Sequence, residues 1–194
     1  PSDMPTKQAA AAVGQCELMY TYDRLFLQYN HTVAQILLTG EDVDHTERRQ
    51  NFENTLERLL ELGALPIINE NDTVATAEIK VGDNDTLGAI VARCAKAELL
   101  VLLSDIDGLY TADPRKDPAA RLIPVVEEVT PQIEALAGGV GSGLATGGMA
   151  TKLRAAKMVA EVGCDMIITN GERPEVLYDI AEGRAVGTRF VGKK

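Results

Sequence analysis

The sequence predicts an α/β fold with a mainly parallel sheet and helices on both of its faces. Short apolar segments alternate with longer segments of helical spacing along the 194 residues, which is the pattern of strand–helix–strand units. The segment 99–103 contains only leucine and valine, as is typical of a strand buried on both faces. Apolar residues make up 45% of the chain and charged residues 25%, which is the balance of a globular domain.

The first half of the chain predicts two helices, two strands and a ribbon. Apolar residues at every third or fourth position predict the helices, and short apolar runs beside turn residues predict the strands. Before the second helix, Asp44 with Glu47 three residues later resembles a capping box. In order, the expected elements are a helix at Lys7–Tyr29, a strand at Val33–Leu38, a helix that Gly63 ends, a strand at Leu65–Asn69 and a β-ribbon at Val74–Val81.

The second half predicts further strand–helix alternation. The expected elements are a helix at Thr86–Ala97, a strand at Leu99–Leu103, a short helix from Thr130-Pro131, a glycine-rich loop at Gly138–Gly148, a helix at Thr151–Val162, a strand at Asp165–Thr169 and a helix at Pro174–Glu182. Asp85 is well placed to cap the first of these helices. Because ligands of parallel α/β sheets bind at the carboxyl ends of strands, polar motifs that follow strands mark candidate sites.

Two polar motifs lie between residues 69 and 85. Asn69, Asn71 and Asp72 come directly after an expected strand, where they form either a nest for a small polar ligand or an ordinary turn. Further on, Asp83 and Asp85 flank Asn84. Two carboxylates this close favour a nearby cation, either Mg²⁺ or a lysine. The alternative is that Asp85 only caps its helix.

A third motif begins with Ser104 and Asp105, which follow the most apolar strand. Its Asp-x-Asp-Gly pattern is not an EF-hand, because Lys116 stands where the closing glutamate of a calcium loop would be. The motif has two interpretations. It is either a loop that holds a nucleotide or a metal at the strand end, or a plain β-turn.

The fourth motif joins a glycine loop to the start of a helix. Glycines let the backbone approach a ligand, and the helix N-terminus with Lys152 favours a phosphate. The spacing is not that of a Walker A loop, and the alternative is a surface loop with a solvated lysine. The motif comprises Thr146, Gly147, Gly148, Met149, Ala150, Thr151 and Lys152.

Together the motifs supply the parts that phosphoryl transfer needs, namely cations, metal-binding oxygens and positioning groups. A carboxylate acceptor would need no general base. The net charge of −10 argues against binding to nucleic acid, and no apolar run approaches the roughly 18 residues of a membrane span. No secretory signal is recognisable, so we expect a cytoplasmic protein.

Six stretches carry a resemblance to a known family: Lys7–Gln15, Ile67–Asp72, Gly82–Thr86, Ser104–Pro114, Gly147–Lys152 and Gly187–Phe190. Their order and spacing resemble those of the amino acid kinases. The pairing of Asn-Glu-Asn-Asp with Gly-Asp-Asn-Asp resembles the glutamate 5-kinases within that family. The resemblance implies a three-layer α/β/α sandwich and ATP-dependent phosphorylation of the γ-carboxylate of L-glutamate, the first step of proline biosynthesis.

The resemblance also implies roles for individual residues. Lys152 would place its charge on the transferred phosphate, and Asp85 would organise the catalytic lysines. Mg²⁺ would bridge the ATP phosphates, with no dedicated protein metal site. The residues implied to bind L-glutamate are Asp72, Asn84, Asn69 and Asn71, and those implied to bind ATP are Ser104, Asp105 and the segment from Thr146 to Lys152. A homodimer or homotetramer, inhibited by proline, is expected.

In one respect the sequence departs from this family. We expect residues 1–194 to be an amino acid kinase domain without the family's opening strand and its phosphate-binding lysine, and without an appended PUA domain. An inactive ligand-binding or regulatory module of the same fold is therefore the alternative function.

Overall fold

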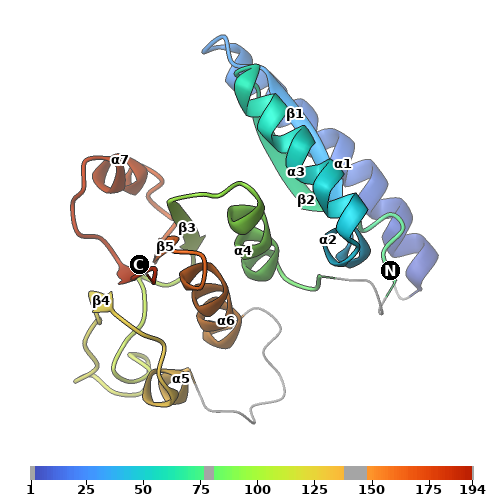
Figure 1. Cartoon of the computed structure of the whole chain (residues 1–194). Helices are drawn as coiled ribbons and strands as arrows, with labels where there is room; N and C mark the ends of the chain where they lie inside the picture. The colour runs from blue at the N-terminus through green and yellow to red at the C-terminus, as the bar shows by residue number, and fades with distance from the viewer. Residues whose placement is uncertain (1–2, 77–80, 138–147, 194) are drawn as a thin grey trace. The chain divides into compact units, whose positions relative to one another are not determined.

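The structure is a computed structural model of the chain, and it describes residues 3–76, 81–137 and 148–193 (Figure 1). The chain forms two compact units, residues 1–84 and residues 85–194, and each is described by itself below. Within the described residues, no helix is both long enough and apolar enough to cross a membrane.

The first unit consists of a two-stranded parallel sheet with three helices. In chain order its elements are α1 (Met4–Leu27), β1 (Val33–Leu38), α2 (Gly40–Asp44), α3 (Thr46–Glu61) and β2 (Leu65–Glu70). The strands pair in register from Val33 opposite Leu65 to Leu38 opposite Glu70. Asp3 caps α1 by accepting a hydrogen bond from the Thr6 backbone N–H at 2.9 Å.

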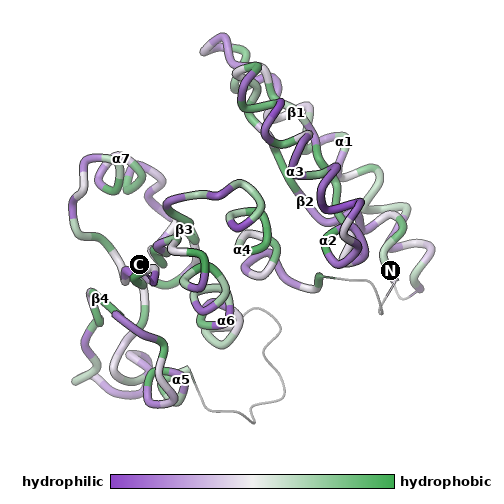
Figure 2. Tube along the Cα trace, in the orientation of Figure 1, coloured by the Kyte–Doolittle hydropathy of each residue, from purple (hydrophilic) through white to green (hydrophobic). Residues whose placement is uncertain are grey.

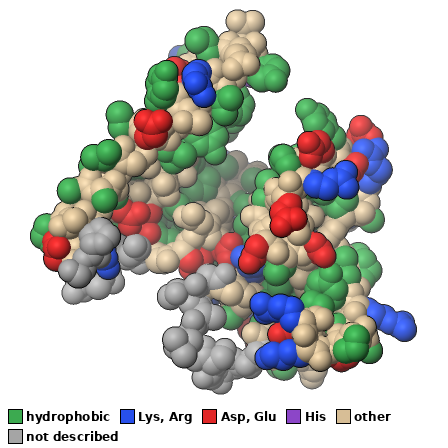
Figure 3. All heavy atoms as spheres, turned by 180° about the vertical axis from the view of Figure 1, so that it is seen from behind, with side chains coloured by type: hydrophobic (Ala, Val, Ile, Leu, Met, Phe, Trp, Pro, Cys, Tyr) green, Lys and Arg blue, Asp and Glu red, His purple; other side chains and the backbone are tan. Residues whose placement is uncertain are grey.

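The two long helices of this unit differ in burial. Helix α3 buries Phe52 and Leu56, as its helical spacing predicts. Helix α1 has no fully buried residue, and large apolar side chains such as Val13 and Tyr20 are 73% and 60% exposed. Hydrophobic side chains are accordingly visible along this unit in Figure 3.

Two predictions for the first unit need correction, and one helix was not predicted. His45, not Asp44, precedes α3 and makes no side-chain capping bond. Asp42 instead accepts hydrogen bonds from the Thr39 backbone and hydroxyl, which begins the unpredicted helix α2. Residues 74–76 form a turn and its exit rather than a ribbon, and residues 77–80 of the expected ribbon lie outside the described residues.

The second unit contains a four-stranded mixed sheet in the order β3-β5-β6-β4. Its elements are α4 (Asn84–Cys94, whose first residue closes the first unit), β3 (Leu99–Ser104), β4 (Val125–Val126), α5 (Pro131–Leu136), α6 (Met149–Ala160), β5 (Asp165–Asn170), α7 (Val176–Ala181) and β6 (Thr188–Phe190). The β3–β5 and β4–β6 pairs are parallel, and the β5–β6 pair is antiparallel. The prediction of a mainly parallel sheet is therefore confirmed.

The core of this unit lies between α6 and the central strand β5. Ala155, Ala156 and Val159 of α6 are fully buried, as are Met166 and Ile168 of β5. Small residues on the helix let it approach the larger side chains of the strand closely. Figure 2 shows hydrophobic residues concentrated on β3 and β5.

Helix boundaries in this unit differ from the predictions at two of the predicted site positions. Helix α4 begins at Asn84, so Asp85 lies in its first turn and is not its cap. Helix α6 begins at Met149, two residues earlier than predicted, after Gly148 as its N-cap. Most of the expected glycine-rich loop, including Thr146 and Gly147, lies outside the described residues. Thr130 does cap α5, as its Thr-Pro sequence predicts.

Strands β4 and β6 were not predicted. Thr188 holds β6 in place, because its fully buried hydroxyl donates to the Ile123 carbonyl at 2.6 Å and accepts from the Leu109 backbone N–H at 2.8 Å. Gly187, just before it, has φ +57°, and a Cβ at this position would overlap the Ile168 carbonyl oxygen. The strand thus depends on partners far away in the sequence.

Candidate active site

A buried ion pair joins the first turns of α4 and α6. The Nζ atom of Lys152 lies 2.9 Å from Oδ2 of Asp85, and the two side chains are only 9% and 16% exposed. Both residues were predicted as catalytic. The structure therefore places a lysine, rather than only solvent, beside one carboxylate of the Asp-Asn-Asp motif.

Thr151 ties this ion pair to the start of α6. Its hydroxyl lies 2.8 Å from Oδ2 of Asp85 and 2.7 Å from the carbonyl oxygen of Gly148. Both neighbours are acceptors, so the single hydroxyl proton is shared between them or given to one. The predicted nucleotide residue Thr151 thus contacts the protein itself, at the point where the helix begins.

The N-terminus of α6 has no side-chain cap. Gly148 has no side chain that could accept from the N–H groups of the first turn, although its carbonyl oxygen accepts from the Thr151 backbone N–H at 3.1 Å. Met149 is half-buried and Ala150 is exposed at this end. A helix end of this kind, beside a lysine, favours an anion.

A second set of polar residues lies where β3 and β5 end. Ser104 is opposite Asn170 in the parallel pair, and its carbonyl oxygen accepts from the Gly171 backbone N–H at 2.8 Å. The Ser104 hydroxyl donates to Asp105 at 3.1 Å. A small pocket of about 180 Å³, lined in part by Asn170, opens at this strand end.

Sequence reasoning missed two residues at this edge, Asp107 and Asn170. The Asn170 side-chain amide donates to Asp107 at 3.0 Å, and the Tyr110 hydroxyl donates to the same carboxylate at 2.9 Å. The hydrogen bond to Asp107 raises the pKa of Tyr110. Asp107 could have been found from the Asp-x-Asp pattern, whereas Asn170 needed the β3–β5 register.

In the first unit, the asparagines after β2 already have protein partners. Asn69 donates from its side chain to Gln15 of α1 at 3.2 Å and accepts from the Glu70 backbone N–H at 2.9 Å. The Asn71 carbonyl accepts from the Val74 and Ala75 backbones, and its side chain accepts from Thr73. The turn interpretation therefore holds for the backbone of this motif.

Glu70, which lies between these asparagines, was not predicted as a site residue. It is 8% exposed, and its carboxylate accepts from the backbone N–H groups of Val81 at 2.6 Å and Gly82 at 3.4 Å. It thereby connects the segment after β2 with the segment that precedes Asp83 and Asn84.

The predicted site residues thus form two groups. Asn69, Asn71, Asp72 and Asn84 belong to the first unit, whereas Asp85, Ser104, Asp105 and the described part of the glycine motif belong to the second. Among residues 3–76, 81–137 and 148–193, no group of three or more histidine, cysteine, aspartate or glutamate side chains could hold a metal ion.

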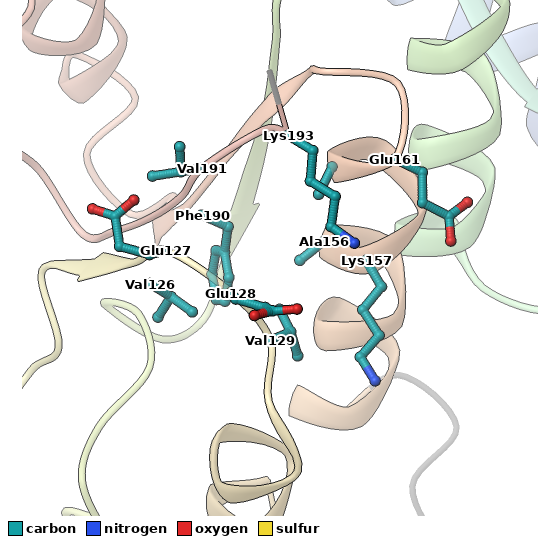
Figure 4. A pocket seen from close by; sticks show the side chains of 11 residues that line it. Val126, Glu127, Glu128, Val129, Ala156, Lys157, Glu161, Phe190, Val191 and Lys193 are labelled. Carbon is teal, nitrogen blue, oxygen red and sulfur yellow. The ribbon is translucent and has the colours of Figure 1, made fainter.

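A separate pocket of about 260 Å³ lies away from the predicted residues in the second unit. Its buried lining includes Val126, Ala156 and Phe190, and lysine and glutamate side chains surround the opening (Figure 4). Lys157 at this opening pairs with Glu134 at 2.5 Å. None of the residues predicted for the site lines this pocket.

The fold and these sequence motifs have counterparts in known proteins. The amino acid kinase family matches residues 2–170 of the chain. The fold is similar to that of the solved structure of T. acidophilum isopentenyl phosphate kinase in a product complex, with a TM-score of 0.59 at 18% sequence identity. The similarity covers 91% of this chain and 66% of that one. The chain belongs to the amino acid kinase family and has its α/β fold.

More similar sequences narrow the comparison within the family. The chain is 53% identical over 190 residues to the glutamate 5-kinase of Clostridium tetani, covering 98% of this chain and 71% of the relative. It is 52% identical to the glutamate 5-kinase of Geobacter sulfurreducens, of which it spans 52%. The chain thus corresponds to about half to three quarters of the length of these relatives.

Proposed function

We propose that the chain phosphorylates the γ-carboxylate of L-glutamate with ATP, yielding γ-glutamyl phosphate for proline biosynthesis. The observation that carries the proposal is the buried Lys152–Asp85 pair at the uncapped start of α6. The identity of about 50% to named glutamate 5-kinases supports the choice of acceptor.

Transfer of the phosphoryl group depends, in this proposal, on a positive charge that the protein orients before the substrate binds. Asp85 fixes the ammonium of Lys152, and Thr151 in turn contacts Asp85. An ammonium that is already oriented and shielded from water stabilises negative charge on a transferred phosphoryl group more effectively than a mobile one. Lys152 is the proposed catalytic residue, and Asp85 orients it.

The nucleotide is proposed to bind at the edge where β3 and β5 end, with Ser104 and Asp105 as contacts. This is the edge at which open α/β sheets bind ligands, and the pocket beside Asn170 opens there. Gly148, Met149 and Ala150 would present backbone N–H groups to the phosphates.

The acceptor is proposed to bind to the residues after β2 and before α4. An amino acid carries one ammonium and two carboxylates. The Asp72 carboxylate suits the ammonium, and the amide of Asn84, with Asn69 and Asn71 nearby in sequence, suits a carboxylate. Because the reacting γ-carboxylate is already ionised at neutral pH, no general base has to remove a proton from it.

The donors of the second unit fit a magnesium ion that is held mainly by ATP. The Asp85 carboxylate contacts the Thr151 hydroxyl and already faces the Lys152 ammonium. Mg²⁺ commonly takes one or two protein oxygens together with substrate phosphates. When bound, it would neutralise charge on the ATP phosphates.

An assay that traps the acyl phosphate tests this function. The full chain is incubated with ATP and Mg²⁺ and with L-glutamate, N-acetylglutamate or UMP, and acyl phosphate is measured as hydroxamate. We expect hydroxamate with L-glutamate, and we expect Lys152→Ala to lower kcat by about 10²-fold or more. Phosphorylation of N-acetylglutamate or UMP but not L-glutamate would contradict the proposal.

The alternative, an inactive ligand-binding or regulatory module of the same fold, stays a prediction. Calorimetry separates it from the enzyme, because binding of L-glutamate or proline without turnover would indicate the module. Assembly into dimers or tetramers, inhibition by proline and a cytoplasmic location remain predictions.

A further inference from the structure

A buried carboxylate at the end of β2 connects the two acceptor motifs of the first unit. Glu70 is 8% exposed, and its two carboxylate oxygens accept from the backbone N–H groups of Val81 and Gly82. Both donors are backbone N–H groups, so replacing the Glu70 side chain removes these bonds without altering the residues that donate them. An ionised acceptor makes them stronger than bonds to a neutral group.

These bonds shorten the distance across a long connection. Val81 follows Glu70 by eleven positions, and an extended chain of that length spans roughly 36–40 Å. The 2.6 Å bond instead brings the ends of the connection to within one side chain of each other. Gly82 has φ +96°, a conformation that favours glycine and lets the chain turn directly after the bond.

The hydrogen bonds continue from Glu70 toward α1. The Glu70 backbone N–H donates to the Asn69 side chain at 2.9 Å, which fixes the orientation of that amide. The Asn69 amide then donates to Gln15 of α1 at 3.2 Å. Glu70 is therefore held from one side while it holds the Val81–Gly82 segment on the other.

We propose that Glu70 is a positioning residue of the acceptor site. Its carboxylate holds the segment leading into Asp83 and Asn84 against the strand end that carries Asn71 and Asp72. The inference rests on the proposed function, because it assumes that these residues bind L-glutamate. It adds a residue that acts on the acceptor without touching it.

The test compares two isosteric variants of the full chain. Glu70→Gln removes the charge that accepts two backbone N–H groups. Asp42→Asn is the matched control, because Asp42 accepts the Thr39 backbone N–H at 2.8 Å in the same unit but outside the acceptor motifs. Three quantities are measured: hydrogen exchange of the Val81 and Gly82 amides, the Kd of L-glutamate and the Kd of ATP.

We expect Glu70→Gln to accelerate exchange of both amides and to raise the Kd of L-glutamate by about tenfold or more, with the Kd of ATP unchanged within twofold. Asp42→Asn should leave all three at the wild-type value. Faster exchange without weaker L-glutamate binding would overturn the inference, because Glu70 would then be structural only. Equal weakening of L-glutamate binding by Glu70→Gln and Asp42→Asn would also overturn the inference.

Failure of the proposed function gives a different result. A wild-type chain that binds ATP but no L-glutamate would contradict the proposed acceptor, and the positioning role with it. A wild-type chain that binds L-glutamate, with Glu70→Gln binding it equally well, would contradict the positioning role alone. A Glu70→Asp variant adds a check. It keeps the negative charge, but its side chain is shorter, so we expect it to bind L-glutamate as weakly as Glu70→Gln.

Discussion

Replacing Asp85 by asparagine should destabilise the protein far more than a surface ion pair would suggest. The change leaves the Lys152 ammonium, whose side chain is 9% exposed, beside a neutral amide. Removing one partner of a buried pair costs about 3–5 kcal/mol, because the remaining charge stays buried without compensation. With a urea m-value of about 2 kcal/mol/M, a loss of about 3 kcal/mol lowers the unfolding midpoint by about 1.5 M.

The same helix supplies the control. Lys157 of α6 pairs with Glu134 at 2.5 Å, but these side chains are 44% and 41% exposed. Glu134→Gln should therefore cost no more than about 1 kcal/mol. Urea unfolding of both variants, followed by circular dichroism, measures the difference.

A double variant tests the cause of the loss. Asp85→Asn combined with Lys152→Met removes both charges, so it should recover a large part of the stability that Asp85→Asn loses. Two results would refute the reasoning: losses that add up in the double variant, or equal midpoint shifts for Asp85→Asn and Glu134→Gln. Either would mean that the ammonium is not buried with Asp85 as its main compensation.

Three further predictions concern stability elsewhere. Thr188→Val should lower the free energy of unfolding by about 2–3 kcal/mol, because the buried Leu109 N–H and the partly buried Ile123 carbonyl lose this partner. Thr188→Ser should restore most of that free energy in urea titrations. Gly187→Ala should lower the Tm more than Gly183→Ala, since both glycines have positive φ but only the first would place its Cβ against a backbone carbonyl. For Asp42, partial burial opposes ionisation, but hydrogen bonds from Thr39 and the charge of Arg48 lower its pKa below 3.8. The stabilisation that ionised Asp42 provides is therefore present above about pH 4 and is lost as the pH falls through the lowered pKa. When the free energy of unfolding is measured against pH, it should fall less steeply in acid for Asp42→Asn than for the wild type.

The sequence pattern predicted elements correctly where neighbouring residues alone determine the structure. Strand β1 has the predicted bounds, Val33–Leu38, because its apolar run is bounded by turn residues. Thr130 begins α5 as predicted, because threonine before proline both caps and pre-organises a helix. The pattern failed for β6, whose three residues are held by Thr188 through partners more than 60 positions away.

The candidate site shows the same division. A pair of aspartates with one residue between them indicated that a cation should lie nearby, and the structure places Lys152 there. Glu70 gave no such signal, because a charged residue at a strand end usually faces water. Its role depends on Val81, a hydrogen-bond partner that lies eleven positions later in the sequence.

The pairing of β3 with β5 determines when the second unit can form. The two strands lie side by side along their whole length, although residues 105–164 separate them in the sequence. Closing a loop of about 60 residues costs about 3.6 kcal/mol in chain entropy beyond a constant, and contacts this distant in sequence slow folding. During synthesis from the N-terminus, β3 therefore cannot pair with β5 until residues 165–170 are available.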